Sequence, residues 1–134
     1  MAGERRTVLQ RGRAKAYRPM AAAARREALE HGFAAFANGD WFLAHELLEP
    51  AWMGTRDVAE RELIQGLIKL AAAFVHDARS NPAGTRKNLQ GARERIAEGR
   101  AAGASIGVDA DALLASVDGW LAAPGGPPIE IPRT

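Results

Sequence analysis

Three ionisable side chains stand close together in an otherwise apolar stretch of the sequence. His45, Glu46 and Glu49 lie between Trp41 and Trp52. If this stretch is a helix, His45 and Glu49 lie one turn apart on the same face. A helix uses this spacing to present two metal ligands, or an imidazole that is oriented by a carboxylate. The pattern is His-Glu-x-x-Glu rather than the His-Glu-x-x-His of zinc peptidases, so that peptidase motif is absent.

A second polar stripe follows in the next predicted helix, which begins at Asp57 and ends near residue 80. Glu62, Gln65 and His76 fall on one face of it, and Gln65 and His76 are eleven residues, or three turns, apart. If this stripe faces His45, then His76 or Glu62 could complete a metal site or contact a ligand. The two stripes together are the most promising place for chemistry in the chain.

Three interpretations of these residues stay open. A carboxylate buried without a partner costs several kcal/mol, so all three interpretations require a partner for His45 and Glu49. The first, which we favour, is a buried His/Glu polar network inside a non-catalytic interaction or structural module. The second is a small-ligand pocket or hydrolase-like site, and the third is a metal site completed by His76 or Glu62. The best catalytic candidates are His45 and Glu49, and the ligand-binding candidates are Glu46, Trp52, Glu62, Gln65 and His76.

The composition limits the class of protein. A chain of 134 residues with 47% hydrophobic residues is long enough for one domain with a core of its own. The sequence has no Cys, which excludes disulfides and thiolate sites and fits a cytoplasmic location. No apolar run approaches the roughly 18 residues that a membrane span needs. We expect no cofactor, and the sequence does not identify a particular metal. A binding or structural protein is better supported than an enzyme.

The positive charge is concentrated at the N-terminus. Six basic residues precede position 19 against Glu4 alone, which leaves 12 basic and 15 acidic residues for the rest of the chain. We therefore expect a solvated basic tail over residues 1–19, with at most weak, salt-dependent contact with nucleic acid. The residues available for that contact are Arg5, Arg6, Arg11, Arg13, Lys15 and Arg18.

The periodicity predicts an all-α protein, a single-domain bundle of about five helices with disordered or extended termini. Asp40, Asp57, Asn81 and Asp109 stand at predicted helix starts, where their side chains can accept the first free backbone N–H groups. The bundle is expected over residues 20–123, followed by a Pro/Gly-rich tail over 124–134 that can lie along it. A glycine inside the third helix, Gly66, predicts close approach of a neighbouring helix, for which the second is the nearest candidate. Exposed apolar surface on such a bundle would permit a homo-oligomer.

Three linked segments carry a resemblance to a known family. They are His-Glu-Leu-Leu-Glu-Pro-Ala-Trp at 45–52, Gln-Gly-Leu-Ile-Lys-Leu-Ala-Ala-Ala-Phe-Val-His at 65–76, and Asn-Pro-Ala-Gly at 81–84. Over about residues 29–97 the chain is similar to the small helical prokaryotic proteins catalogued as domain of unknown function 309. The resemblance implies a compact all-α bundle and no particular activity. Two residues depart from the family: Lys69 stands where Gln is frequent, and Thr85 where Ala is usual. A cation at position 69 would argue against a divalent metal on that stripe.

Overall fold

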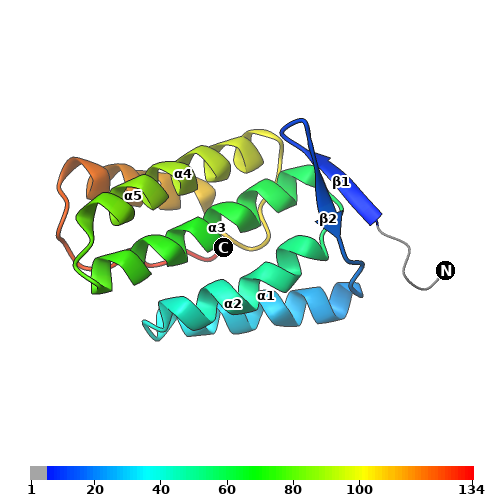
Figure 1. Ribbon diagram of the computed structural model, residues 1–134, viewed down its shortest axis with the longest axis horizontal. Helices are drawn as coiled ribbons and strands as arrows, with labels where there is room; N and C mark the ends of the chain where they lie inside the picture. The colour runs from blue at the N-terminus through cyan, green and yellow to red at the C-terminus, as the bar shows by residue number, and fades with distance from the viewer. Residues whose placement is uncertain (1–5) are drawn as a thin grey trace.

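The computed structural model describes residues 6–134, in which four helices are arranged about a fifth, the long central helix α3 (Val58–Ala78) (Figure 1). The hairpin of α1 and α2 lies on one side of α3, and α4 and α5 lie on the other. The chain therefore forms the predicted all-α bundle. The helices are α1 (Ala22–Ala37), α2 (Trp41–Met53), α3 (Val58–Ala78), α4 (Pro82–Ala101) and α5 (Ala110–Ala122).

Four of the helices begin where side-chain caps were predicted. Asp40, Asp57, Asn81 and Asp109 each accept a hydrogen bond from the backbone N–H three residues further on, at 3.1 to 3.3 Å. Each cap satisfies one backbone donor that the first turn of a helix leaves without a partner. These local bonds fix where α2 to α5 start, and so fix which side chains share a face.

The core is centred on α3, which contributes eight buried apolar residues to it. Gly66 lies on the side of α3 that contacts α4: a Cβ atom there would stand 2.6 Å from Cγ1 of Ile96 and 3.2 Å from the backbone oxygen of Ala92. Close helix approach at Gly66 is confirmed. The expected neighbour was wrong, because α4 and not α2 occupies that side. The buried core residues of α3 are Leu63, Ile64, Leu67, Ile68, Leu70, Ala71, Ala73 and Phe74.

The basic N-terminal segment is an ordered β-hairpin over residues 6–17, so our expectation of a solvated tail was wrong there. Strands β1 (Arg6–Gln10) and β2 (Arg13–Tyr17) pair antiparallel, and the turn between them has positive φ at Arg11 (54°) and Gly12 (76°). Two consecutive positive φ angles match the twist of a two-residue hairpin. The hairpin crosses the end of α3 (Figure 1). Arg5, one of the predicted nucleic-acid contacts, lies outside the described residues.

The C-terminal segment after α5 is extended, as predicted, and runs back along the bundle. Ile129 is buried at 6% exposure. Arg133 donates to the backbone oxygen of Gly107 and to the carboxylate of Glu30, and its guanidinium carbon lies 3.9 Å from the centre of the Phe33 ring. Within residues 6–134, no helix combines the length and apolar character that a membrane crossing demands.

Candidate functional site

Helix α2 carries the three ionisable residues: His45 and Glu49 are half-buried, whereas Glu46 is exposed. Its fully buried positions are Ala44, Leu48 and Ala51, which alternate by three and four residues and pack into the core. His45 and Glu49 each follow one of these positions by a single residue, so they lie at the edge of the buried face. Helix geometry therefore places them where solvent and protein meet.

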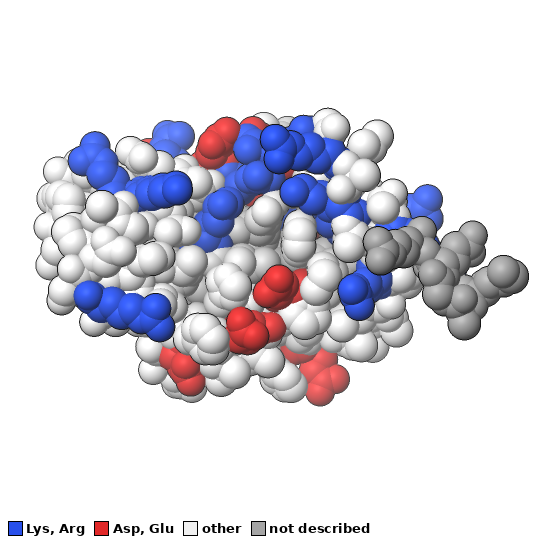
Figure 2. All heavy atoms as spheres, viewed as in Figure 1, with Lys and Arg blue, Asp and Glu red and all other residues white. Residues whose placement is uncertain are grey.

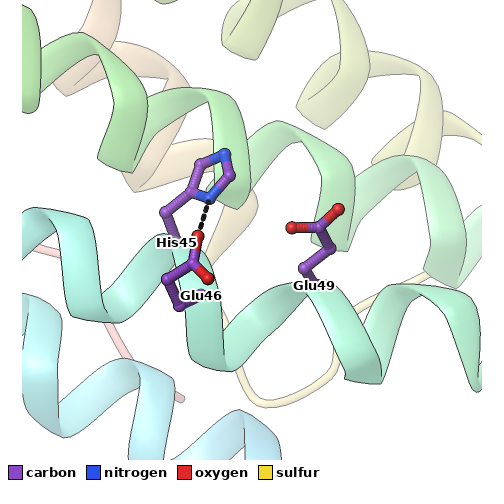
Figure 3. A group of neighbouring side chains, drawn as sticks. All are labelled: His45, Glu46 and Glu49. Atoms are coloured by element: carbon purple, nitrogen blue, oxygen red, sulfur yellow. Dashed lines mark ion pairs between the residues drawn. The ribbon is translucent and has the colours of Figure 1, made fainter.

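The nitrogen of His45 and the carboxylates of Glu46 and Glu49 converge (Figure 3). One ligand atom from each residue can be chosen so that all lie within 4.8 Å of one another. Nδ1 of His45 is 3.5 Å from Oε1 of Glu46, and within residues 6–134 the buried Nδ1 has no hydrogen-bond partner. A buried polar atom without a partner is unfavourable, so an additional group at this point would stabilise the arrangement.

The expected buried His45–Glu49 pair is not what the structure contains. The His45 side chain is 33% exposed and Glu46 is 54% exposed, and the ion-pair distance runs from His45 to Glu46 rather than to Glu49. A pair of this exposure contributes little to stability. His45 thus lies in a solvent-accessible site, and the buried polar network is formed by other residues.

A small hollow beside this cluster brings His76 of α3 next to His45. The hollow has a volume of about 170 Å³ and is open to solvent; its lining residues are Phe42, His45, Ala72, Val75, His76 and Arg79. A hollow beside His45 that His76 also lines is one feature that a ligand site here would need. His31, by comparison, is 62% exposed on α1, where Glu27 is its ion-pair partner.

Asn81 determines how His76 can take part. The side-chain oxygen of Asn81 accepts from the backbone N–H of Gly84, so its amide nitrogen is the atom 3.1 Å from Nδ1 of His76. An amide nitrogen can only donate, so Nδ1 accepts and Nε2 carries the proton of the neutral ring. His76 is therefore a hydrogen-bond donor through Nε2 rather than a ready metal ligand.

The buried polar network is centred on Arg61, which is fully buried and was not among the predicted residues. Its guanidinium donates to the backbone oxygens of Trp52, Thr55 and Ala16 at 3.0 to 3.3 Å. Burial lowers the pKa of Arg61, yet arginine stays charged at neutral pH because its ordinary pKa is so high. The sequence does contain a signal for this site, because Arg61 precedes buried Ile64 by three residues and therefore shares its face.

Gln10 of the hairpin links this arginine to α2 and α3. Its side chain is 1% exposed, and its oxygen accepts from Nε of Arg61 and from the indole N–H of Trp52, both at 3.2 Å. Its amide nitrogen donates to Oε1 of Gln65 at 2.6 Å. The Arg61 guanidinium also lies 4.8 Å from the Trp52 ring centre, a cation–π distance. Trp52 and Gln65, predicted as ligand contacts, are thus engaged in holding the hairpin.

Glu62 belongs to the same region and not to the His45 cluster. It is 5% exposed and accepts from Nη1 of Arg95 at 3.1 Å, and the same nitrogen donates to Gln65 at 2.9 Å. The structure therefore divides the predicted site residues into two groups. His45, Glu46, Glu49 and His76 gather at the α2–α3 face, whereas Trp52, Glu62 and Gln65 lie beneath the hairpin.

Part of the chain is similar to a known protein family. The model of the family described as Domain of unknown function (DUF309) matches residues 29–88. The similarity covers a little under half of the 134-residue chain. The DUF309 segment includes the whole His45 cluster, His76 and Arg61, while Gln10 and Arg95 lie outside it. The searches of curated proteins and of solved structures gave no significant match.

Proposed function

We propose that this protein binds a divalent metal ion through His45, Glu46 and Glu49. The observation that carries the proposal is the convergence of one nitrogen and two carboxylate oxygens within 4.8 Å. Nδ1 of His45 is also buried, and the part of the chain that the structure describes offers it no hydrogen-bond partner. A mixed nitrogen and oxygen donor set suits Zn²⁺, Mn²⁺ or Fe²⁺. Two carboxylates would also neutralise the charge of the ion.

The surroundings support a site that holds a ligand as well as an ion. Three protein ligands leave coordination positions open for water or a small molecule. The adjoining hollow supplies His76, a hydrogen-bond donor through Nε2, and Arg79, a cation. A small anionic ligand bound to the metal would find both groups in this hollow.

The position of Lys69 removes the objection raised from the sequence. Its side chain passes 3.1 Å from where a Cβ of Gly91 on α4 would stand. The charged groups that influence its pKa are Arg95, Arg11, Glu94 and Lys87, none of which belongs to the His45 cluster. The cation at position 69 therefore lies in the region of the hairpin and α4.

Calorimetric titration of the tag-free protein with Zn²⁺ and Mn²⁺ tests the proposal. We expect one ion per chain, and at least a tenfold loss of affinity in His45→Ala and in Glu49→Gln. His31→Ala is the matched control, because His31 and Glu27 have the same spacing on α1 without a third ligand. Titration with Co²⁺, followed by its visible absorption, reports on the ligand set. Equal affinity in wild type and His45→Ala would refute the site.

The interaction module favoured from the sequence is the second candidate. Phe42 and Leu43 on α2 are 62% and 43% exposed, so they offer apolar surface to a partner. A second copy of this chain is the partner that we expect at this surface. Light scattering after size exclusion should detect a dimer that Phe42→Ser weakens, and a monomer at all concentrations would contradict self-association.

A further inference from the structure

We propose that the hollow beneath the hairpin binds the phosphate group of a small phosphorylated molecule. This hollow has a volume of about 440 Å³ and is separate from the His45 cluster. Four of its six lining residues are cations and one is a carboxylate. They are Gln10, Arg11, Arg13, Lys15, Glu94 and Arg95.

The strand register explains why the cations point into the hollow. Gln10 pairs with Arg13 and Val8 pairs with Lys15, and directly opposed residues of an antiparallel pair lie on the same face. Gln10 is buried against α3, so Arg13 and Lys15 share the face that is turned toward the helices. The alternate residues Ala14 and Ala16 lie on the outer face; Arg13 is itself exposed and Lys15 half-buried where they line the hollow. The hairpin therefore holds these two charges in place, which a solvated tail could not do.

The carboxylates near the hollow pair with Arg11 and Arg95, two of its four lining cations. Glu94 and Glu98 pair with Arg11, and Glu62 pairs with Arg95. Within residues 6–134, neither Arg13 nor Lys15 has a carboxylate at ion-pair distance. Figure 2 shows Lys and Arg side chains gathered over the hairpin and the adjoining end of α4. The hollow thus carries an excess of positive charge that an anion would balance.

Lys69 adds to this positive charge from α3. Burial, followed by the positive charges of Arg95 and Arg11, lowers the pKa of Lys69. Both arginines line the hollow. Glu94 opposes this lowering, and a bound anion would place a further negative charge beside these cations.

The chemistry of the lining favours a small phosphate ester over a nucleic acid. Guanidinium groups recognise phosphate oxygens with two parallel hydrogen bonds, and an ammonium group contributes a point charge. A volume of about 440 Å³ falls within the range of small-molecule pockets. Proteins that bind single strands stack bases on aromatic side chains, and none of the six lining residues is aromatic.

Calorimetric titration in the presence of EDTA tests the site without metal bridging. The probes are inorganic phosphate, pyrophosphate, glycerol 3-phosphate and a ten-nucleotide single strand, at matched ionic strength. We expect saturable one-to-one binding of glycerol 3-phosphate or pyrophosphate. Arg13→Gln combined with Lys15→Gln should weaken that binding at least tenfold. If glycerol 3-phosphate binds more tightly than inorganic phosphate, an organic ester is the ligand, and the reverse order assigns the site to the free ion.

The matched control removes two exposed cations elsewhere, Arg56→Gln with Arg86→Gln, and changes the net charge by the same amount. Both double variants are checked for an unchanged melting temperature, since the substituted side chains lie outside the core. The control should bind as the wild type does. Equal weakening in the two variants would show that the overall charge causes the effect. That result would overturn the site. Tighter binding of the oligonucleotide than of any small phosphate, abolished by the same pair of substitutions, would also overturn it.

Discussion

Arg61 is a full positive charge inside the protein, and its neighbours compensate for it almost entirely with uncharged oxygen atoms. Three backbone carbonyls and the Gln10 amide accept its hydrogen bonds. Removing the guanidinium while the fold is kept would take the donor away from all four oxygens. The cost of a substitution here is therefore the cost of leaving several buried acceptors without a donor.

We predict that Arg61→Met lowers the free energy of unfolding by about 3 kcal/mol, although methionine fills much of the same volume. Urea denaturation followed by tryptophan fluorescence measures the change. Arg56→Met, at an exposed position just before α3, is the control and should stay within about 0.5 kcal/mol of wild type. A loss below about 1 kcal/mol for Arg61→Met would mean that water replaces the missing donor.

At the scale of the helices, Gly66 and Gly119 differ in the space that surrounds them. Gly66 has Ile96 of α4 against it, whereas a Cβ at Gly119 of α5 would meet nothing within 4 Å. Alanine is a better helix former than glycine by about 1 kcal/mol in both positions. Only the contact with α4 distinguishes them.

We predict that Gly66→Ala destabilises the protein by about 1 to 3 kcal/mol, because the added methyl forces α3 and α4 apart. Gly119→Ala should stabilise it by about 0.5 kcal/mol, since helix propensity acts there alone. Thermal melting of the two variants beside wild type compares them. The same sign for both changes would show that the α3–α4 contact adapts without cost.

The helices were predictable because their signals are local. Asp40, Asp57, Asn81 and Asp109 act within three residues of their own positions, and the chain there has one favourable conformation. The hairpin was missed because its charges suggested a solvated tail. Its signals were Gly12 in the turn and the alternation along β2.

The site was predictable only in part, because only some of its signals are local in the sequence. His45 and Glu49 could be placed on one helix face from their spacing. A hollow that both His45 and His76 line could be named only as a requirement of a ligand site. The burial of Gln10 against Gln65 could not be predicted, since that contact joins residues 55 positions apart. No periodicity within either segment encodes such a contact.

For the molecule as a whole, both chain ends described by the structure are attached to the bundle by arginines. Arg11 joins the hairpin to α4, and Arg133 joins the C-terminal segment to α1. A hydrogen bond from Arg133 holds the pKa of Glu30 below its ordinary value of 4.5. A carboxylate with a lowered folded-state pKa stabilises the fold above its ordinary pKa, and this contribution is lost as the pH falls through the lowered value.

We predict that Arg133→Ala lowers the free energy of unfolding by about 1 kcal/mol at neutral pH, from the lost ion pair and the lost contact with Phe33. The melting temperature should fall by about 4 °C. Hydrogen exchange should increase mainly in residues 127–134. The difference from wild type should persist from pH 8 to pH 5.5 and shrink below pH 4.5. Lys87→Ala, exposed on α4, controls for the loss of one charge. A difference that does not change down to pH 3 would assign the effect to Phe33 and not to Glu30.

The attachment of Gln10 has a consequence for related chains. The segment shared with the family contains the buried arginine, but the amide that accepts from it is contributed by residues upstream of that segment. Substitutions at positions 10 and 61 should therefore covary among relatives: a sequence without the hairpin would carry an apolar residue in place of the arginine. A fragment trimmed to residues 29–88 would retain the cation without this acceptor, and we expect it to aggregate when expressed alone.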